Sequence, residues 1–111
     1  MIGVDVVDIG RLRTALERSP RLEARLFTSA ERAYCRSRHN WVQHLAGTLA
    51  AKEAVIKALR LGSLPAWAQR IEVRRDPDGV PSAVVAGTQV LVSISHDGPV
   101  AVAVALAPPG G

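Results

Sequence analysis

The sequence predicts an α+β fold, with an N-terminal strand and helices packed on an antiparallel sheet built mainly from the C-terminal half. Residues 2–7 are rich in β-branched side chains, and apolar residues then recur at helical spacing up to residue 61. From Ile71 onward the pattern changes to alternation, which is typical of strands. Helices followed by a run of strands favour the α+β class. We expect one domain over residues 1–111, because two cores in this length would each be too small.

The first helix is predicted to follow the strand at residues 2–7 directly. Ile9, Leu12 and Leu16 lie at helical spacing on one face. Ser19-Pro20 is expected to end this helix, because proline cannot continue it.

Two further helices are predicted from capping signals. Thr28 and Glu31 have the spacing of a capping box, which opens a helix that continues to about residue 38. Asn40 is expected to cap a long helix over residues 41–61, and Gly62 is expected to stop it.

The second half is predicted to form four strands joined by tight turns. The strands are expected over residues 71–75, 82–86, 90–95 and 100–107. Turn-forming residues at 76–79, 87–89 and 96–99 separate them. We expect the tail, residues 108–111, to be frayed.

Composition excludes several classes of protein. No apolar run is long enough to span a bilayer as a helix, and we expect no secretory signal. The single cysteine, Cys35, excludes an internal disulfide and a Cys-rich zinc site, and we interpret it as a packed thiol. We therefore expect a cytoplasmic domain without membrane attachment.

Positive charge is concentrated in one segment. The whole chain carries a formal net charge of +4, whereas residues 10–38 hold eight arginines and three glutamates. Such a surface attracts acidic partners, which include nucleic acid, an acidic protein and phosphorylated ligands. An ordinary solvated helix face is the alternative interpretation, and charge alone does not decide between them.

Two acidic residues lie among apolar neighbours. Asp5 interrupts the first strand, and Glu53 lies in the middle of the long helix beside small apolar residues. A carboxylate there is costly unless it is paired or bound to a cation, and two together suit Mg²⁺. Lys57 projects from the same helical face as Glu53, whereas Lys52 points elsewhere. The alternatives are a surface ion pair between Glu53 and Lys57, and a cap or arginine partner for Asp5.

His96 follows a strand directly, beside Ser95. A histidine at such a junction can bind a phosphate or act as a base, although a polar turn residue is the simpler interpretation. A Ser-His-Asp triad does not follow, because adjacent strand residues point to opposite faces.

Several short motifs occur in order along almost the whole chain. They are Ile2-Gly3-Val4-Asp5, Phe27-Thr28 with Glu31, Ala51-Lys52-Glu53-Ala54 with Lys57-Ala58, Gly79-Val80-Pro81, and Ser93-Ile94-Ser95-His96. This order and spacing resembles the 4′-phosphopantetheinyl transferases, and most closely their small branch, the holo-acyl-carrier-protein synthases. The early GxD together with KExxxK is the signature of that family.

The resemblance implies transfer of 4′-phosphopantetheine from coenzyme A to a serine of an acyl carrier protein, with release of adenosine 3′,5′-bisphosphate. Asp5 and Glu53 would hold Mg²⁺ against the pyrophosphate, and Glu53 could accept the serine proton, directly or through a metal-bound water. Lys57 would stabilise the phosphate charge. Coenzyme binding would also involve Lys57 itself, Arg60, Gly79, Pro81 and His96.

The resemblance also implies partners. Members of the family dock the acidic second helix of the carrier protein with their first helix, and the matching arginines here are Arg11, Arg18 and Arg21. Charge complementarity would then account for the basic segment. Small members are homotrimers with the active site between subunits, which would suit a chain with a small core. Fatty-acid, polyketide and peptide-synthesis carriers all remain possible.

The chain departs from the family pattern at five places. Leu49 stands where Phe or Trp is usual, and Asp97 stands where Thr or Ser is usual. Thr48 stands where an arginine is common. Arg60 stands at the first glycine of the usual Gly-Thr-Gly, and could supply a phosphate contact instead. The short helix that often precedes the Ser93–His96 strand is reduced to residues 87–89.

Two other functions are compatible with parts of the sequence. A non-catalytic module that binds coenzyme A or a carrier protein would account for Arg60 and the shortened connection. A small basic nucleic-acid-binding domain would account only for the arginines, and its affinity would fall steeply with salt. We expect no nucleic-acid partner.

Overall fold

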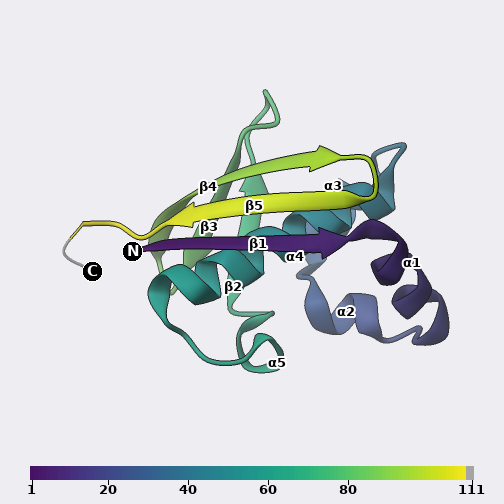
Figure 1. The fold of residues 1–111 in the computed structure, drawn as a ribbon, viewed down its shortest axis with the longest axis horizontal. Coiled ribbons are helices and arrows are strands. Elements are labelled where there is room, and N and C mark those ends of the chain that lie inside the picture. Colours follow the sequence, from purple (N-terminus) through teal and green to yellow (C-terminus); the bar gives the residue numbers. More distant parts are fainter. Residues whose placement is uncertain (110–111) are drawn as a thin grey trace.

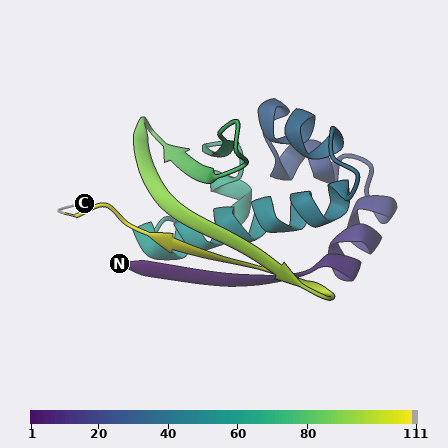
Figure 2. The same ribbon diagram turned by 90° about the horizontal axis from the view of Figure 1, so that it is seen from above.

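The computed structural model describes residues 1–109 and confirms the α+β class (Figure 1). Its elements are, in chain order, β1 (Ile2–Asp8), α1 (Ile9–Arg18), α2 (Leu22–Leu26), α3 (Ser29–Arg36), α4 (Trp41–Leu59), α5 (Leu64–Trp67), β2 (Ile71–Arg75), β3 (Pro81–Val85), β4 (Thr88–Asp97) and β5 (Val100–Leu106). The strands form one antiparallel sheet in the order β1-β5-β4-β3-β2. The first strand therefore lies beside the last, and α4 packs along one face of the sheet (Figure 2).

Every predicted strand is present, with ends shifted by at most two residues. The largest difference is at the connection between β3 and β4. Ala86 and Gly87 have φ values of 49° and 81° and form a two-residue turn, so Thr88 and Gln89 already belong to β4. Positive φ at both positions is typical of the tight turns that suit the twist of paired strands. Of the tail predicted to fray, residues 110–111 lie outside the described residues.

The capping box that the sequence predicts is formed. Thr28 Oγ1 accepts from the Glu31 N–H at 3.2 Å, and Glu31 Oε1 accepts from the Thr28 N–H at 2.8 Å. Asn40 lies at the predicted start of α4, although its side chain makes no capping hydrogen bond.

The predicted end of α4 at Gly62 is wrong. The helix ends at Leu59, and Arg60 adopts the left-handed conformation, with φ 54° and ψ 47°. The N–H of Leu61 then donates to the carbonyl oxygen of Ile56 at 3.0 Å, which closes the helix in the way a glycine usually does. Sequence reasoning placed the end at the nearest glycine and did not expect an arginine in this role.

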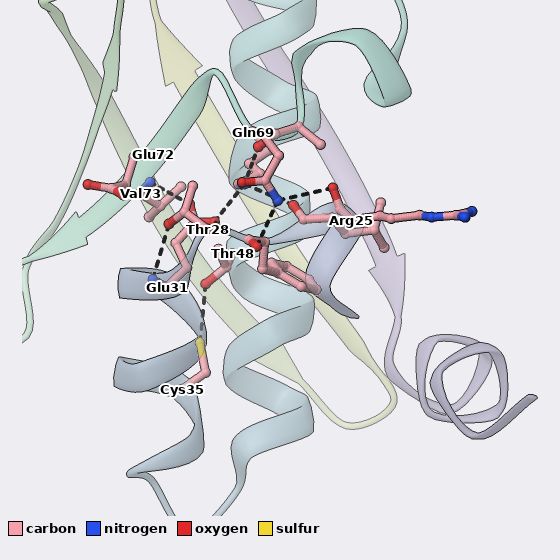
Figure 3. A network of polar contacts seen from close by, with 12 residues as sticks. Arg25, Thr28, Glu31, Cys35, Thr48, Gln69, Glu72 and Val73 are labelled. Carbon is pink, nitrogen blue, oxygen red and sulfur yellow. Dashed lines mark hydrogen bonds and ion pairs between the residues drawn. The ribbon is translucent and has the colours of Figure 1, made fainter. Parts of the chain in front are cut away.

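The short helices α2 and α5 were not predicted, because neither is long enough to display a helical period. The C-terminal end of α2 is held by a side chain from far along the chain. The Gln69 amide donates to the carbonyl oxygens of Ala24 (2.7 Å), Arg25 (3.3 Å) and Phe27 (2.9 Å), as Figure 3 shows in part.

A buried ion pair joins α4 to α3. Lys52 Nζ lies 2.6 Å from Glu31 Oε1, and neither side chain is exposed to solvent. Lys52 also donates to the carbonyl oxygens of Leu26 and Ala68, while Glu31 accepts from the Val73 N–H at 2.7 Å (Figure 3). Burial raises the pKa of Glu31 and lowers that of Lys52, and the attraction between the two charges opposes both effects. The pair and its hydrogen bonds therefore hold α4 against α3, β2 and the ends of α2 and α5.

The opposite face of the sheet is apolar and uncovered. Six large side chains on β1, β4 and β5 are between 40% and 66% exposed and form what we call the outer apolar face: Ile2, Val4, Val6, Leu91, Val104 and Leu106. Their strands pair in register, so that Leu106 lies between Ile2 and Leu91. An apolar area of this kind on a small protein usually marks a contact surface.

No helix within residues 1–109 has both the length and the apolar character needed to cross a membrane. Cys35 is buried, in agreement with its interpretation as a packed thiol, and burial raises its pKa.

Candidate active site

Asp5 and Glu53 come together because β1 touches the backbone of α4. A Cβ atom at Gly3 would lie 1.9 Å from the carbonyl oxygen of Ala54, so only glycine permits this approach. Asp5 lies two residues further along the same face of β1, and Glu53 precedes Ala54. Both carboxylates line one open hollow of about 350 Å³, which we call the acidic hollow.

Lys57 pairs with Asp5. Its ammonium nitrogen lies 3.0 Å from Asp5 Oδ1 and 3.0 Å from the carbonyl oxygen of Val4. The alternative of a surface ion pair between Glu53 and Lys57 is wrong, because within residues 1–109 the ion pair of Lys57 is with Asp5. The alternatives for Asp5 are wrong as well. Within residues 1–109 its ion pair is with Lys57 and with no arginine, and the residue that caps α1 is Asp8.

The Glu53 carboxyl is in an unfavourable place for a negative charge. Partial burial raises its pKa, the charge of Asp5 raises it further, and the charge of Lys57 lowers it. A carboxylate with too little compensating charge is a candidate ligand for a cation and a candidate base.

Arg11 connects the acidic hollow to the exposed face of α1. Asp8 caps α1 by accepting from the Arg11 N–H at 2.9 Å, and both residues line the acidic hollow beside Asp5. Arg11 and Arg18 are exposed and line one shallow depression on α1. Arg21, also exposed, precedes α2. Two of the three predicted carrier-binding arginines therefore share one surface.

A second hollow, of about 160 Å³, contains Gly79, Pro81 and His96. We call it the nucleotide hollow, after the part of coenzyme A that the resemblance predicts for these residues. Strand pairing brings Pro81 to the end of β2, and β4 carries His96. The Gln43 amide nitrogen lies within hydrogen-bond distance of His96 Nε2, at 3.0 Å. These three belong to the five residues predicted to bind coenzyme A, and the fold places them together. The other two, Lys57 and Arg60, are not among the described lining residues of this hollow.

Sequence reasoning missed other residues of the nucleotide hollow. Gln43 and His44 were not identified as candidate ligand-binding residues, and Arg75 was interpreted only as the end of a strand. Burial lowers the pKa of His44, and the positive charges of Arg75 and Arg38 lower it further. No local pattern identifies these side chains, because they meet only when β2 pairs with β3 and α4 crosses the sheet.

The two hollows lie on opposite sides of α4. Gly47 lines the nucleotide hollow and Leu49 lines the acidic hollow, and two residues along an α-helix turn by about 200°. The hollows share no lining residue among those described. The predicted groups are therefore divided between two places on one chain.

Arg60 is exposed at the end of α4 and is not among the described lining residues of either hollow. Its left-handed backbone occupies a position where glycine is favoured. A glycine at this position of the chain would adopt the same conformation without strain.

Comparison with known proteins agrees with that resemblance. The model of the 4′-phosphopantetheinyl transferase superfamily matches residues 1–105. The holo-[acyl-carrier-protein] synthase of Moorella thermoacetica is 41% identical over 115 residues, covering 94% of this chain and 90% of the relative. The corresponding protein of Desulforudis audaxviator is 42% identical over 118 residues, covering 96% and 90%.

Solved structures give the same result for the fold. The holo-[acyl-carrier-protein] synthase of Helicobacter pylori, in complex with coenzyme A, has a TM-score of 0.81 and 28% identity, covering 96% of this chain and 98% of the other. That of Bacillus anthracis, in complex with CoA (3′,5′-ADP), has a TM-score of 0.79 and 32% identity, covering 94% and 91%.

Proposed function

Because this chain belongs to the 4′-phosphopantetheinyl transferase superfamily, we propose that Asp5, Glu53 and Lys57 form the centre at which it transfers a phosphoryl group. The chain is a transferase of the holo-acyl-carrier-protein synthase type, which moves 4′-phosphopantetheine from coenzyme A to an acyl carrier protein. The observation that carries the proposed centre is the meeting of Asp5 and Glu53 in the acidic hollow.

In the proposed reaction, the hydroxyl oxygen of a carrier serine attacks the phosphorus that bears the pantetheine arm. A new P–O bond forms as the phosphoanhydride bond breaks, and adenosine 3′,5′-bisphosphate leaves. Glu53 accepts the serine proton, since a carboxylate with a raised pKa is a better base than an ordinary one. The Lys57 ammonium, beside Asp5, balances the negative charge that grows on the leaving phosphate.

The donor set of the acidic hollow fits Mg²⁺. This ion prefers one or two carboxylates and completes its shell with water and phosphate oxygens. Asp5 and Glu53, which both line the acidic hollow, would be the two protein ligands. When bound, the ion would neutralise charge on the transferring phosphoryl group.

We assign the nucleotide half of coenzyme A to the nucleotide hollow. Gly79 and Pro81 shape its wall, and His96 offers a ring nitrogen to the ligand. Gly79 has a φ of 84°, which favours glycine at this turn. Arg60 remains a predicted phosphate contact, although it is not among the described lining residues of either hollow.

The carrier protein is expected to dock on α1. Arg11 and Arg18 are exposed on one surface of that helix, and Arg11 also borders the acidic hollow. A carrier with acidic side chains bound there, with Arg21 at the edge, would bring its serine near Glu53. We expect this reaction to take place in the cytoplasm.

We further propose that the working enzyme is a homotrimer with its active site between subunits. Two observations support this proposal. The outer apolar face leaves large side chains in water, and a neighbouring copy would cover them. The acidic and nucleotide hollows lie on opposite sides of α4, so a neighbour would be needed to place one beside the other.

Intact-mass spectrometry tests the reaction directly. An apo acyl carrier protein incubated with this protein, coenzyme A and Mg²⁺ should gain the mass of one phosphopantetheine. EDTA or Glu53→Ala should abolish the gain, whereas Glu72→Ala, which changes a glutamate on β2 that pairs with Arg74, should leave it intact. Full activity in Glu53→Ala would refute the proposed centre. Coenzyme binding without transfer to any of a panel of carriers would identify a binding module instead.

Complementation tests the shared site. Glu53→Ala and His96→Ala proteins should each be inactive alone, and a co-refolded mixture should recover part of the activity if neighbouring copies supply the two groups. A monomer has a mass of 11.8 kDa, and light scattering should give a threefold mass for the wild type and a monomer for Val4→Lys on the outer apolar face. An active monomer would contradict the proposal.

A further inference from the structure

The nucleotide hollow contains one permanently charged side chain, which no motif of the sequence identified. Among its described lining residues, Arg75 is the only Lys or Arg. It ends β2 and pairs across the ladder with Pro81, which lines the same hollow. Unlike His44 and His96, an arginine keeps its charge at any working pH. The wall of this hollow therefore always carries a positive charge.

The charge of Arg75 is not balanced by a carboxylate. Its neighbour Arg74 donates to Glu72 at 3.0 Å, and Arg32 and Arg36 both pair with Glu23. No ion pair within residues 1–109 includes Arg75, although it is only partly exposed. Its field also reaches the neighbouring ring of His44, whose pKa it helps to lower. An anionic ligand would supply the missing negative charge.

The guanidinium of Arg75 is held in place by neutral groups. The Thr48 hydroxyl donates to the carbonyl oxygen of His44 at 2.9 Å, so its oxygen is free to accept from Arg75 Nη2 at 3.3 Å. The Arg75 guanidinium carbon also lies 5.0 Å from the centre of the Tyr34 ring. These contacts orient the side chain without neutralising it, and they leave further N–H donors for a ligand.

The position of Thr48 adds to this argument. Thr48 is buried on α4, and the guanidinium that reaches its hydroxyl comes from the end of β2. This contact holds the positive charge of Arg75 against α4, at the wall of the nucleotide hollow.

We infer that Arg75 binds the 3′-phosphate of coenzyme A. This inference rests on the proposed function, in which the acidic hollow takes the pyrophosphate and the nucleotide hollow takes the adenosine half. The remaining phosphate of that half is the one on the ribose 3′-oxygen, a dianion suited to a planar guanidinium. Arg75 thereby distinguishes coenzyme A from its 3′-dephospho form.

Isothermal titration calorimetry with coenzyme A and 3′-dephospho-coenzyme A tests this inference. The wild type should bind coenzyme A more tightly, and Arg75→Gln should weaken coenzyme A binding by about tenfold or more, the effect of losing a charge-assisted hydrogen bond. The same variant should change the affinity for 3′-dephospho-coenzyme A by less than about twofold, because the phosphate that Arg75 contacts is absent. Arg75→Lys should retain part of the preference. Arg74→Gln is the matched control and should behave as the wild type.

The outcomes separate the inference from the proposed function. If the wild type transfers phosphopantetheine and Arg75→Gln keeps the full preference for coenzyme A, Arg75 does not bind the 3′-phosphate. An equal loss of affinity for both ligands would also overturn the inference, since it would indicate damage to the hollow. If the wild type binds neither ligand and transfers nothing, the proposed function fails and the inference falls with it. Arg75→Lys, which keeps the charge, provides the same comparison if Arg75→Gln does not fold.

Discussion

Helix α4 carries two lysines five residues apart, and each pairs with an acidic residue from another element. Lys52 and Glu31 are fully buried, whereas Lys57 is 53% exposed and its partner Asp5 is 16% exposed. The buried pair has hydrogen-bond partners on several elements, and no buried side-chain polar atom in residues 1–109 lacks one. The exposed pair lies beside Glu53, whose charge is poorly compensated. The Lys52–Glu31 pair therefore stabilises the fold, whereas the Lys57–Asp5 pair is accessible to ligands.

Removing one charge of the buried pair should have the largest effect on the free energy of unfolding. Lys52→Ala leaves Glu31 buried without its partner, which costs about 3–5 kcal/mol of the free energy of unfolding. Lys57→Ala removes an exposed partner and should cost less than about 1 kcal/mol. Urea unfolding of both variants at one protein concentration measures the difference. Equal midpoints for the two variants would remove the basis of the comparison.

The exposed lysine should matter for the reaction instead. Lys57→Gln should lower kcat of phosphopantetheine transfer by about 100-fold, in the range found for losing one electrostatic donor to a transition state. Its unfolding midpoint should stay close to that of the wild type. Lys57→Arg, which keeps the charge, should recover part of kcat. Unchanged kcat in Lys57→Gln would show that this ammonium does not stabilise the leaving group.

A substitution at Arg60, the left-handed residue at the end of α4, should have a smaller effect on stability, and here we expect a gain. Arg60→Gly should stabilise the protein by about 1 kcal/mol, because glycine adopts φ 54° without the penalty that a Cβ brings. Arg60→Ala is the control, since it shortens the side chain and keeps the strained backbone. Thermal unfolding of the three proteins decides: a melting temperature for Arg60→Ala as high as that for Arg60→Gly would assign the effect to charge.

The smallest predicted effect is on the pH dependence of stability, through the carboxyl of Glu53. The pKa of Glu53 is raised in the folded protein, so its contribution to stability is complete below the unfolded pKa and is lost as pH rises through the folded pKa. Glu53→Gln should therefore be as stable as the wild type near pH 4 and more stable at pH 7. Solvent screening keeps the gain below about 1 kcal/mol. Melting temperatures measured at both pH values check the sign, and a destabilised variant at pH 7 would contradict it.

The features predicted well from sequence are those encoded locally. The spacing of Thr28 and Glu31 specifies a capping box by itself, and alternation beginning at Ile71 is enough to predict strands. The grouping of Asp5 with Glu53 came from the cost of a carboxylate among apolar neighbours and from the resemblance to a family. The grouping of Gly79 with His96 came from the resemblance alone. Both groups are together in the fold, and their roles in catalysis and binding stay predictions.

Long-range pairing explains what was missed. The helical period indicates that Lys52 faces away from Glu53, but it does not identify Glu31 as the residue that meets it. Arg75 gave no signal because a strand-end arginine is ordinary until the fold brings Thr48 beside it. The end of α4 was misplaced because an arginine in a left-handed conformation has no sequence pattern of its own.

Gly3 has a consequence for how this enzyme can change during evolution. Every other amino acid has a Cβ, and at this position that atom would collide with the backbone of Ala54. A substitution would push β1 away from α4 and increase the separation of Asp5 and Glu53, even though both carboxylates would still be present. The separation of Asp5 and Glu53 therefore depends on a residue that has no side chain and takes no part in the chemistry.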